Sequence, residues 1–117
     1  MIKLQAEKGL IYITSNVFAN LVGDAATSCF GVKGMAKRSL NDGLVHLLKR
    51  EAMSKGIYIS YEDDAAVSIE LHIIVDRGVN IPALCRSIIQ EVKYKVKTVT
   101  GVDVNKVNVF IDSISAD

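Results

Sequence analysis

The sequence predicts an α+β fold in which helices pack on one face of a small mixed β-sheet. In residues 57 to 75 and 107 to 111, apolar residues alternate with other residues, which is typical of half-buried strands. In three other segments, apolar residues recur every three or four positions, which is typical of amphipathic helices. The expected order is β-α-(short β)-α-β-β-α-β. The chain of 117 residues is half hydrophobic and fits one domain over residues 1–117.

The first strand is expected at Ile11 and Ile13, which share one face. A helix should follow at once, because Thr14 or Ser15 can accept hydrogen bonds from the free amides of a first turn. Gly31 should stop this helix, as a residue that is free to take positive φ. The apolar stripe of the helix consists of Phe18, Leu21, Val22, Ala25 and Cys29.

A short extended connection at residues 32–36 leads to a second expected helix at residues 39–55. Gly43, inside that helix, costs about 1 kcal/mol relative to alanine. A polar turn at residues 62–64 then joins two strands into a hairpin. The second helix has an apolar face of Leu40, Leu44, Leu47 and Leu48. The inward faces of the two strands consist of Ile57, Ile59, Tyr61, Val67, Ile69, Leu71, Ile73 and Val75.

A long helix should run from Asn80, a good N-cap, to about Val99. Pro82 fits its first turn, where the missing N–H is harmless, and Gly101 closes it. The apolar stripe of this helix consists of Leu84, Cys85, Ile88, Val92, Val96 and Val99.

The alternation slips by one residue after this helix. Val102 and Val104 are out of step with the strand that follows, whose inward residues are Val107, Val109 and Ile111. We interpret the slip as a boundary between a loop and a strand; a bulge at Asn105 is the second interpretation.

Composition narrows the classes of function. The 14 basic and 13 acidic residues give a net charge of +1, which argues against a protein that mainly coats nucleic acid. The sequence shows neither an apolar run of about 18 residues nor a signal peptide, so we expect a cytoplasmic protein without direct membrane insertion. Cys29 and Cys85 are expected to be reduced thiols, with a disulfide as the minor alternative.

Four motifs, taken in order, resemble the alkaline shock protein family of Gram-positive bacteria, which consists of small cytoplasmic proteins. The last motif is the most specific, because it fixes seven residues in ten. The motifs are Gly9-x-Ile11-x-Ile13, Gly31-Val32-x-Gly34-Met35, Gly78-x-Asn80-Ile81 and Thr100-Gly101-Val102-x-Val104-x-x-Val107-Asn108-Val109. The short chain looks most like the compact branch often encoded beside a fatty-acid kinase of the dihydroxyacetone-kinase type. Residues 37 to 55 depart from the family pattern.

The resemblance implies helices on one face of a mixed sheet, no enzyme activity and no cofactor. It also implies a role in cell-envelope homeostasis and stress. Some members gather at the inner face of the membrane through a membrane-anchored protein partner and self-associate there. From this resemblance we expect a scaffold or adaptor; the alternatives are an accessory subunit of a lipid-metabolism kinase and a KH-like nucleic-acid-binding module.

Candidate chemical sites are weak in this sequence. His46 and His72 could join a carboxylate to hold zinc, but their spacing fits no standard site, and we expect both to be solvated surface residues. The acidic turn at residues 62–64 lacks the ligand order of a calcium loop. The sequence Gly31-Val32-Lys33-Gly34 has the form of the G-x-x-G loop of KH domains, so Gly31, Lys33 and Gly34 are candidates for contact with a nucleic-acid backbone.

Two surfaces are candidates for binding partners. Polar residues on the exposed side of the long helix form a stripe suited to an acidic protein or an anionic membrane surface, namely Arg86, Gln90, Lys93 and Lys97 with Tyr94 beside them. On the last strand, Phe110 is a large aromatic residue on the outer face. If this strand pairs with residues 67–75, Phe110 and Ile74 can form an apolar patch for self-association.

Overall fold

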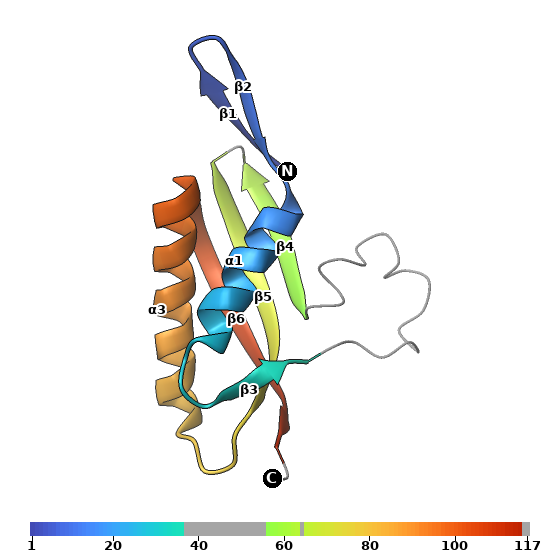
Figure 1. Ribbon diagram of the computed structural model, residues 1–117, viewed down its shortest axis with the longest axis vertical. Coiled ribbons are helices and arrows are strands. Elements are labelled where there is room, and N and C mark those ends of the chain that lie inside the picture. Colours follow the sequence, from blue (N-terminus) through green and yellow to red (C-terminus); the bar gives the residue numbers. More distant parts are fainter. Residues whose placement is uncertain (37–55, 64, 116–117) are drawn as a thin grey trace, which may run out of the picture.

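The structure, a computed structural model, describes residues 1–36, 56–63 and 65–115 (Figure 1). The second helix, expected at residues 39–55, lies outside the described residues. The elements in chain order are β1 (Ile2–Ala6), β2 (Gly9–Ile13), α1 (Ser15–Thr27), β3 (Val32–Met35), β4 (Ile57–Asp63), β5 (Ala66–Val75), α3 (Ile81–Thr100) and β6 (Asp103–Ile114).

The main sheet is built around β5. Strand β6 pairs with one edge of β5 in parallel, and β3 and β4 both pair with it antiparallel, so the sheet is mixed as predicted. Strands β4 and β3 pair with the same edge of β5, one after the other, and meet at His72. The amide of His72 donates to the carbonyl of Gly56, and the carbonyl of His72 accepts from the amide of Ala36. At this junction Gly56 has φ 68°, and a Cβ atom on it would lie 2.3 Å from the carbonyl oxygen of Ala36. Only glycine fits there.

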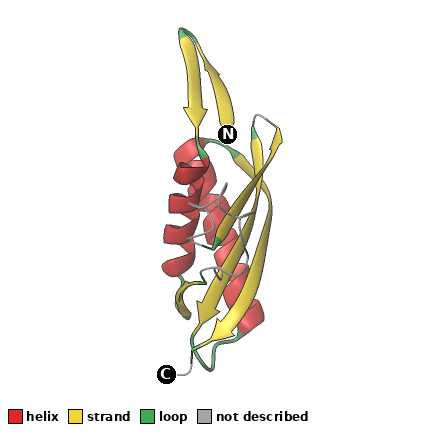
Figure 2. Cartoon of the chain, turned by 90° about the vertical axis from the view of Figure 1, so that its right-hand side faces the viewer, coloured by secondary structure: helices red, strands yellow, loops and turns green. Residues whose placement is uncertain are grey.

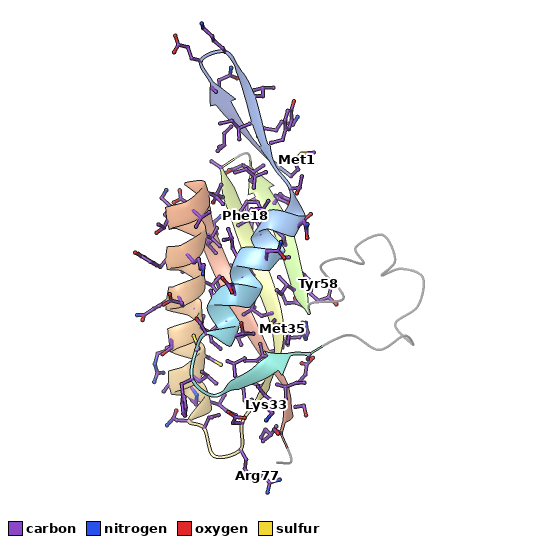
Figure 3. All side chains as sticks on the ribbon, viewed as in Figure 1. Met1, Phe18, Lys33, Met35, Tyr58 and Arg77 are labelled. Carbon is purple, nitrogen blue, oxygen red and sulfur yellow. The ribbon has the colours of Figure 1, made fainter. Side chains whose placement is uncertain are left out.

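Both described helices cover the same face of this sheet (Figure 2). The five alternating residues of β5 from Val67 to Val75 face them and are buried, which confirms the predicted hairpin and its inward face. Phe18, labelled in Figure 3, is fully buried on α1 and meets the ring of Tyr61 edge-on, with ring centroids 6.3 Å apart. The buried stripe of α3 consists of Leu84, Ile88, Val92 and Val96; Val99, expected to join it, is exposed.

The ends of the long helix follow the prediction. The Asn80 side chain accepts a hydrogen bond from the amide of Ala83 at 3.0 Å, and Gly101 takes φ 77° just past the last turn. The first helix differs from the prediction at both ends. Thr14 is its N-cap residue but makes no side-chain capping bond, and the helix ends at Thr27, before Gly31. Gly31 does take positive φ, at 107°, in the turn that leads to β3.

The N-terminal strand expected at Ile11 and Ile13 exists, but it does not belong to the main sheet. It is the second strand of a separate hairpin, whose first strand, β1, was not predicted. Ile2 pairs with Ile13 at the base of this hairpin and is completely buried in the core. The rest of the hairpin extends beyond the main sheet (Figure 1).

The slip in the last strand is a bulge. Val67 pairs with Val104 and Ser68 pairs with Lys106, so Asn105 is an extra residue within β6. The interpretation as a loop-to-strand boundary is therefore wrong, and the second interpretation is confirmed. A second irregularity follows at Asp112, because Ile73 pairs with Ile111 and Ile74 pairs with Ser113.

Candidate functional site

His72 lies at the centre of the sheet, on the face opposite the helices. It was expected to be a solvated surface residue, and that expectation is wrong: the residue is 4% exposed. Its ring lies between two aromatic rings from the neighbouring strands. Tyr58 of β4 meets it edge-on with centroids 5.5 Å apart, and Phe110 of β6 stacks on it at 4.7 Å and an interplanar angle of 12°. Phe110 itself is 45% exposed on this outer face.

Each ring nitrogen of His72 lies beside a carboxylate. Nε2 is 2.7 Å from Oε2 of Glu70, and Nδ1 is 3.0 Å from Oδ2 of Asp112. Asp112 is the extra residue at the second bulge of β6, between the paired residues Ile111 and Ser113, and from there its carboxylate reaches the ring. An ionised carboxylate only accepts hydrogen bonds, so a ring nitrogen that carries a hydrogen donates it to the carboxylate beside it.

This arrangement makes His72 a structural residue. Its two nitrogens are occupied by carboxylates and its ring is packed between two aromatic side chains, so it presents no free nitrogen to a metal ion or a substrate. Within the part of the chain that the structure describes, no three His, Cys, Asp or Glu side chains gather in a way that could hold a metal. His46 lies outside the described residues. The environment of His72 could not be predicted from the sequence, because Asp112 is 40 residues away and reaches the ring only through the bulge in β6.

The predicted stripe on α3 is on the surface. The four residues from its first part are all exposed: Arg86, Gln90, Lys93 and Tyr94. Lys97 is exposed too, but its ammonium group donates to the carboxylate of Asp103 at 2.9 Å and to the carbonyl of Gly101 at 3.2 Å. Lys97 therefore helps to fix the end of the helix, and the rest of the stripe runs from Arg86 to Tyr94.

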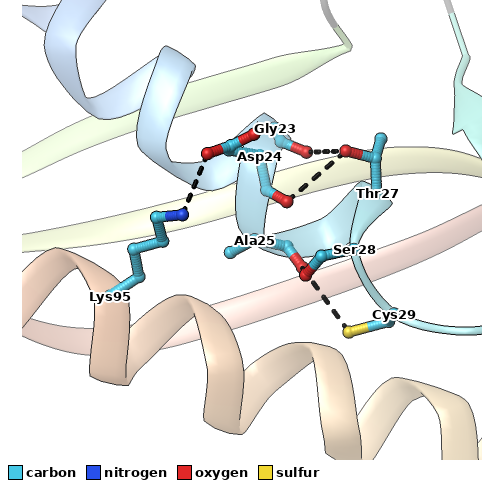
Figure 4. Close-up of polar contacts among 7 residues, drawn as sticks. All are labelled: Gly23, Asp24, Ala25, Thr27, Ser28, Cys29 and Lys95. Atoms are coloured by element: carbon cyan, nitrogen blue, oxygen red, sulfur yellow. Dashed lines mark hydrogen bonds and ion pairs between the residues drawn. The ribbon is translucent and has the colours of Figure 1, made fainter.

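Another lysine of this helix links the two helices. Lys95 Nζ lies 2.9 Å from the carboxylate of Asp24 on α1 (Figure 4). Helix α3 carries four cations and one acidic residue, so its own net charge is +3 even though the whole chain is nearly neutral. Because Lys95 pairs with Asp24 and Lys97 with Asp103, Arg86 and Lys93 are the cations of α3 that form no ion pair within the described part of the chain.

The G-x-x-G segment does not form the loop of a KH domain. Gly31 is buried in a turn, where its carbonyl accepts from the amide of Asp76 and a Cβ atom would lie 2.9 Å from Val79. Lys33 and Gly34 belong to strand β3, and Gly34 pairs with Ile74. Lys33 is exposed at the same end of the molecule as Arg77 (Figure 3). A strand begins where a KH domain would need a helix.

The acidic turn uses its side chains within the hairpin. The hydroxyl of Ser68 donates to the carboxylate of Glu62, and the amide of Ala65 donates to Asp63 at 2.7 Å. Asp64 lies outside the described residues. These contacts give two of the three carboxylates a local structural role.

Both cysteines are free thiols, as expected. Cys29 lies in the turn after α1, not inside a helix, and its thiol donates to the carbonyl of Ala25 at 3.5 Å (Figure 4). Burial raises the pKa of both thiols, and for Cys29 the carboxylate of Glu91 raises the pKa further. A raised pKa disfavours the reactive thiolate, so neither residue has the environment of a catalytic cysteine.

No described helix is long and apolar enough to cross a bilayer.

Residues 3–116 match the model of the alkaline shock protein family, which is described as having a cell envelope-related function. The chain is 33% identical over 114 residues to the uncharacterized protein YloU of Bacillus subtilis strain 168, covering 97% of this chain and 94% of YloU. It is 32% identical over 114 residues to the uncharacterized protein Spy1614 of Streptococcus pyogenes serotype M6, covering 97% and 93%.

A solved structure titled "MamM-CTD H285A" is similar in shape, with a TM-score of 0.51 over 86% of this chain and 98% of that chain. Its sequence identity is 14%, so this likeness concerns the fold alone.

Proposed function

The chain belongs to the alkaline shock protein family, whose function is related to the cell envelope, and from this premise we propose that it is a non-catalytic adaptor that self-associates and binds an acidic protein partner. The partner is membrane-anchored in this proposal, and the adaptor works as a cytoplasmic protein at the inner face of the membrane. The buried, fully engaged His72 supports a non-catalytic role, because the most enzyme-like group of residues in the described part of the chain is used to hold the sheet together.

The observation that carries the proposal is the exposed side of α3. Arg86 and Lys93 form no ion pair with any described residue, and Tyr94, next to Lys93, is 67% exposed. Arginine and tyrosine are enriched in protein interfaces, where they combine a polar group with a large contact area. Opposite charge on a partner would speed association and set its orientation, and this attraction weakens as salt screens it.

A charge reversal tests this surface. We expect the variant Arg86→Glu/Lys93→Glu to lose a partner that co-purifies with the native chain at low salt. Lys33→Glu/Lys106→Glu is the matched control, because it makes the same change of charge at exposed cations on β3 and β6 rather than on α3. Equal retention of the partner by the native chain and by the double variant would show that α3 is not the binding surface. Equal loss in the control would show that only net charge matters.

A further inference from the structure

The N-terminal hairpin has an unprotected edge. Strands β1 and β2 form a two-stranded sheet of their own, and within the described residues the outer edge of β2 pairs with no other strand. An isolated two-stranded sheet is only marginally stable in water, and a third strand or a packed face usually completes it. The base of this hairpin is anchored by Ile2, but its outer part extends from the body (Figure 1).

The composition of β2 makes this edge unusual. Its five residues, GLIYI, include no charged residue and no proline, and Leu10, Ile11 and Tyr12 are 50%, 50% and 53% exposed. Natural proteins protect a free edge with charged residues, proline or a covering element, because a bare apolar edge is a template for pairing with another strand. Strand β1 carries Lys3 and so has one such protection, whereas β2 has none.

We propose that β2 pairs antiparallel with β2 of a second copy of this chain, about a two-fold axis through Ile11. In this register Ile11 faces its own equivalent, Leu10 faces Tyr12 of the other copy, and Gly9 faces Ile13. A two-fold contact requires a surface that is complementary to itself. The uncharged strand meets this requirement, because no pair in this register brings like charges together.

The proposed sheet also continues each copy's core. Leu4 pairs with Ile11 and Ile2 pairs with Ile13, so these four residues share one face of the hairpin. Ile2 and Ile13 join the core at the base. Joining two copies gives a four-stranded sheet with a continuous apolar row across Leu4 and Ile11 of both chains. This continuity with the two cores favours a second copy over an unrelated strand as the occupant of the edge.

This inference rests on the self-association proposed above and specifies its surface, so the first test separates the two. Light scattering over a dilution series should show a dimer of the native chain that dissociates on dilution. Ile11→Lys should be monomeric at every concentration, because it places two like charges opposite each other at the axis. Gln5→Lys adds the same charge to β1 and should stay dimeric, and so should Phe110→Ser, which changes the other predicted contact.

Cross-linking tests the register in a Cys29→Ser/Cys85→Ser background. Opposed residues of antiparallel strands have Cα atoms about 4.5 or 5.5 Å apart, which is within reach of a disulfide. Under mild oxidation, Ile11→Cys should therefore give a covalent dimer. Gln5→Cys should not, because the two outer strands lie about 14 Å apart, three strand spacings. If Ile11→Lys fails to fold, cross-linking of Ile11→Cys still tests whether β2 forms the contact.

The outcomes distinguish the two proposals. A native chain that is monomeric at all concentrations would contradict the self-association itself. A native dimer that persists in Ile11→Lys, or that cross-links no better through residue 11 than through residue 5, would contradict only the β2 contact. Loss of the dimer in Phe110→Ser but not in Ile11→Lys would place the interface on the outer face of the main sheet.

Discussion

The contact between His72 and Asp112 should contribute measurably to the stability of the sheet. A hydrogen bond to a charged group typically contributes about 1.5–3 kcal/mol. The side chains of Glu70 and Asp112 are 40% and 38% exposed, so solvent screening reduces each contribution to about 1 kcal/mol. The two aromatic contacts of the ring add about 0.5–1.5 kcal/mol each. We therefore expect His72→Ala to lower the free energy of unfolding by about 3 kcal/mol, and Asp112→Asn by about 1 kcal/mol.

A double-mutant cycle isolates the contact itself. Urea unfolding followed by circular dichroism gives the free energy of unfolding of the native chain, the two single variants and the double variant at fixed pH and low salt. The coupling energy between residues 72 and 112 should be about 1 kcal/mol. Asp103 supplies the control, because it lies far along β6 and pairs with Lys97, and a cycle of residues 72 and 103 should be additive. A coupling energy for His72 and Asp112 that is as small as the control would refute the reasoning.

Three further predictions concern the fold. Gly56→Ala should lower the free energy of unfolding by about 3 kcal/mol, because a Cβ atom would lie 2.3 Å from a backbone carbonyl oxygen. The control Gly78→Ala, at φ 88° in open space, should lower it by about 1 kcal/mol. Equal losses of the two variants in urea unfolding would argue against the clash. Tyr61→Phe should leave stability unchanged or raise it by about 1 kcal/mol, because the buried hydroxyl has no hydrogen-bond partner among the described residues; a clear loss on thermal unfolding would contradict this. Alkylation of Cys29 should need a higher pH than that of an unfolded thiol, since burial and Glu91 raise its pKa; Glu91→Gln should lower the pH midpoint of the alkylation rate, and an unchanged midpoint would remove Glu91 as a cause.

The two described helices and the β4–β5 hairpin could be predicted because each has one face that must be buried. Phe18, Val22 and Ala25 repeat at helical spacing, and the residues of β5 alternate, so the local pattern and the three-dimensional position agree. The N-terminal hairpin could be predicted only in part, because much of it does not face the core. Leu10 and Tyr12 are apolar but exposed, so their pattern carries no information about which sheet they join.

The environment of His72 could not be predicted, because it depends on three strands. The alternation of β5 correctly placed the residue on the face away from the helices, and residues on such a face are normally solvated. Two non-local features bury it here: the register that sets Phe110 opposite it, and the bulge that turns Asp112 toward its ring. The sequence contains a sign of the first bulge in β6, in the slip at Asn105, but none of the second.

The two proposed contacts lie on different elements, and this separation affects how strongly an adaptor could bind. Helix α3 begins at the end of the molecule remote from the N-terminal hairpin (Figure 1), so Arg86, in its second turn, is far from the β2 edge. A dimer joined through β2 would therefore display two α3 stripes at once. Two weak sites on one particle bind a surface that carries many copies of the partner more tightly than either site alone, without any new contact. The monomeric variant Ile11→Lys should then keep its affinity for a single soluble copy of the partner. It should lose affinity for an array of copies on a vesicle. Equal binding of monomer and dimer to that array would show that self-association does not serve partner binding.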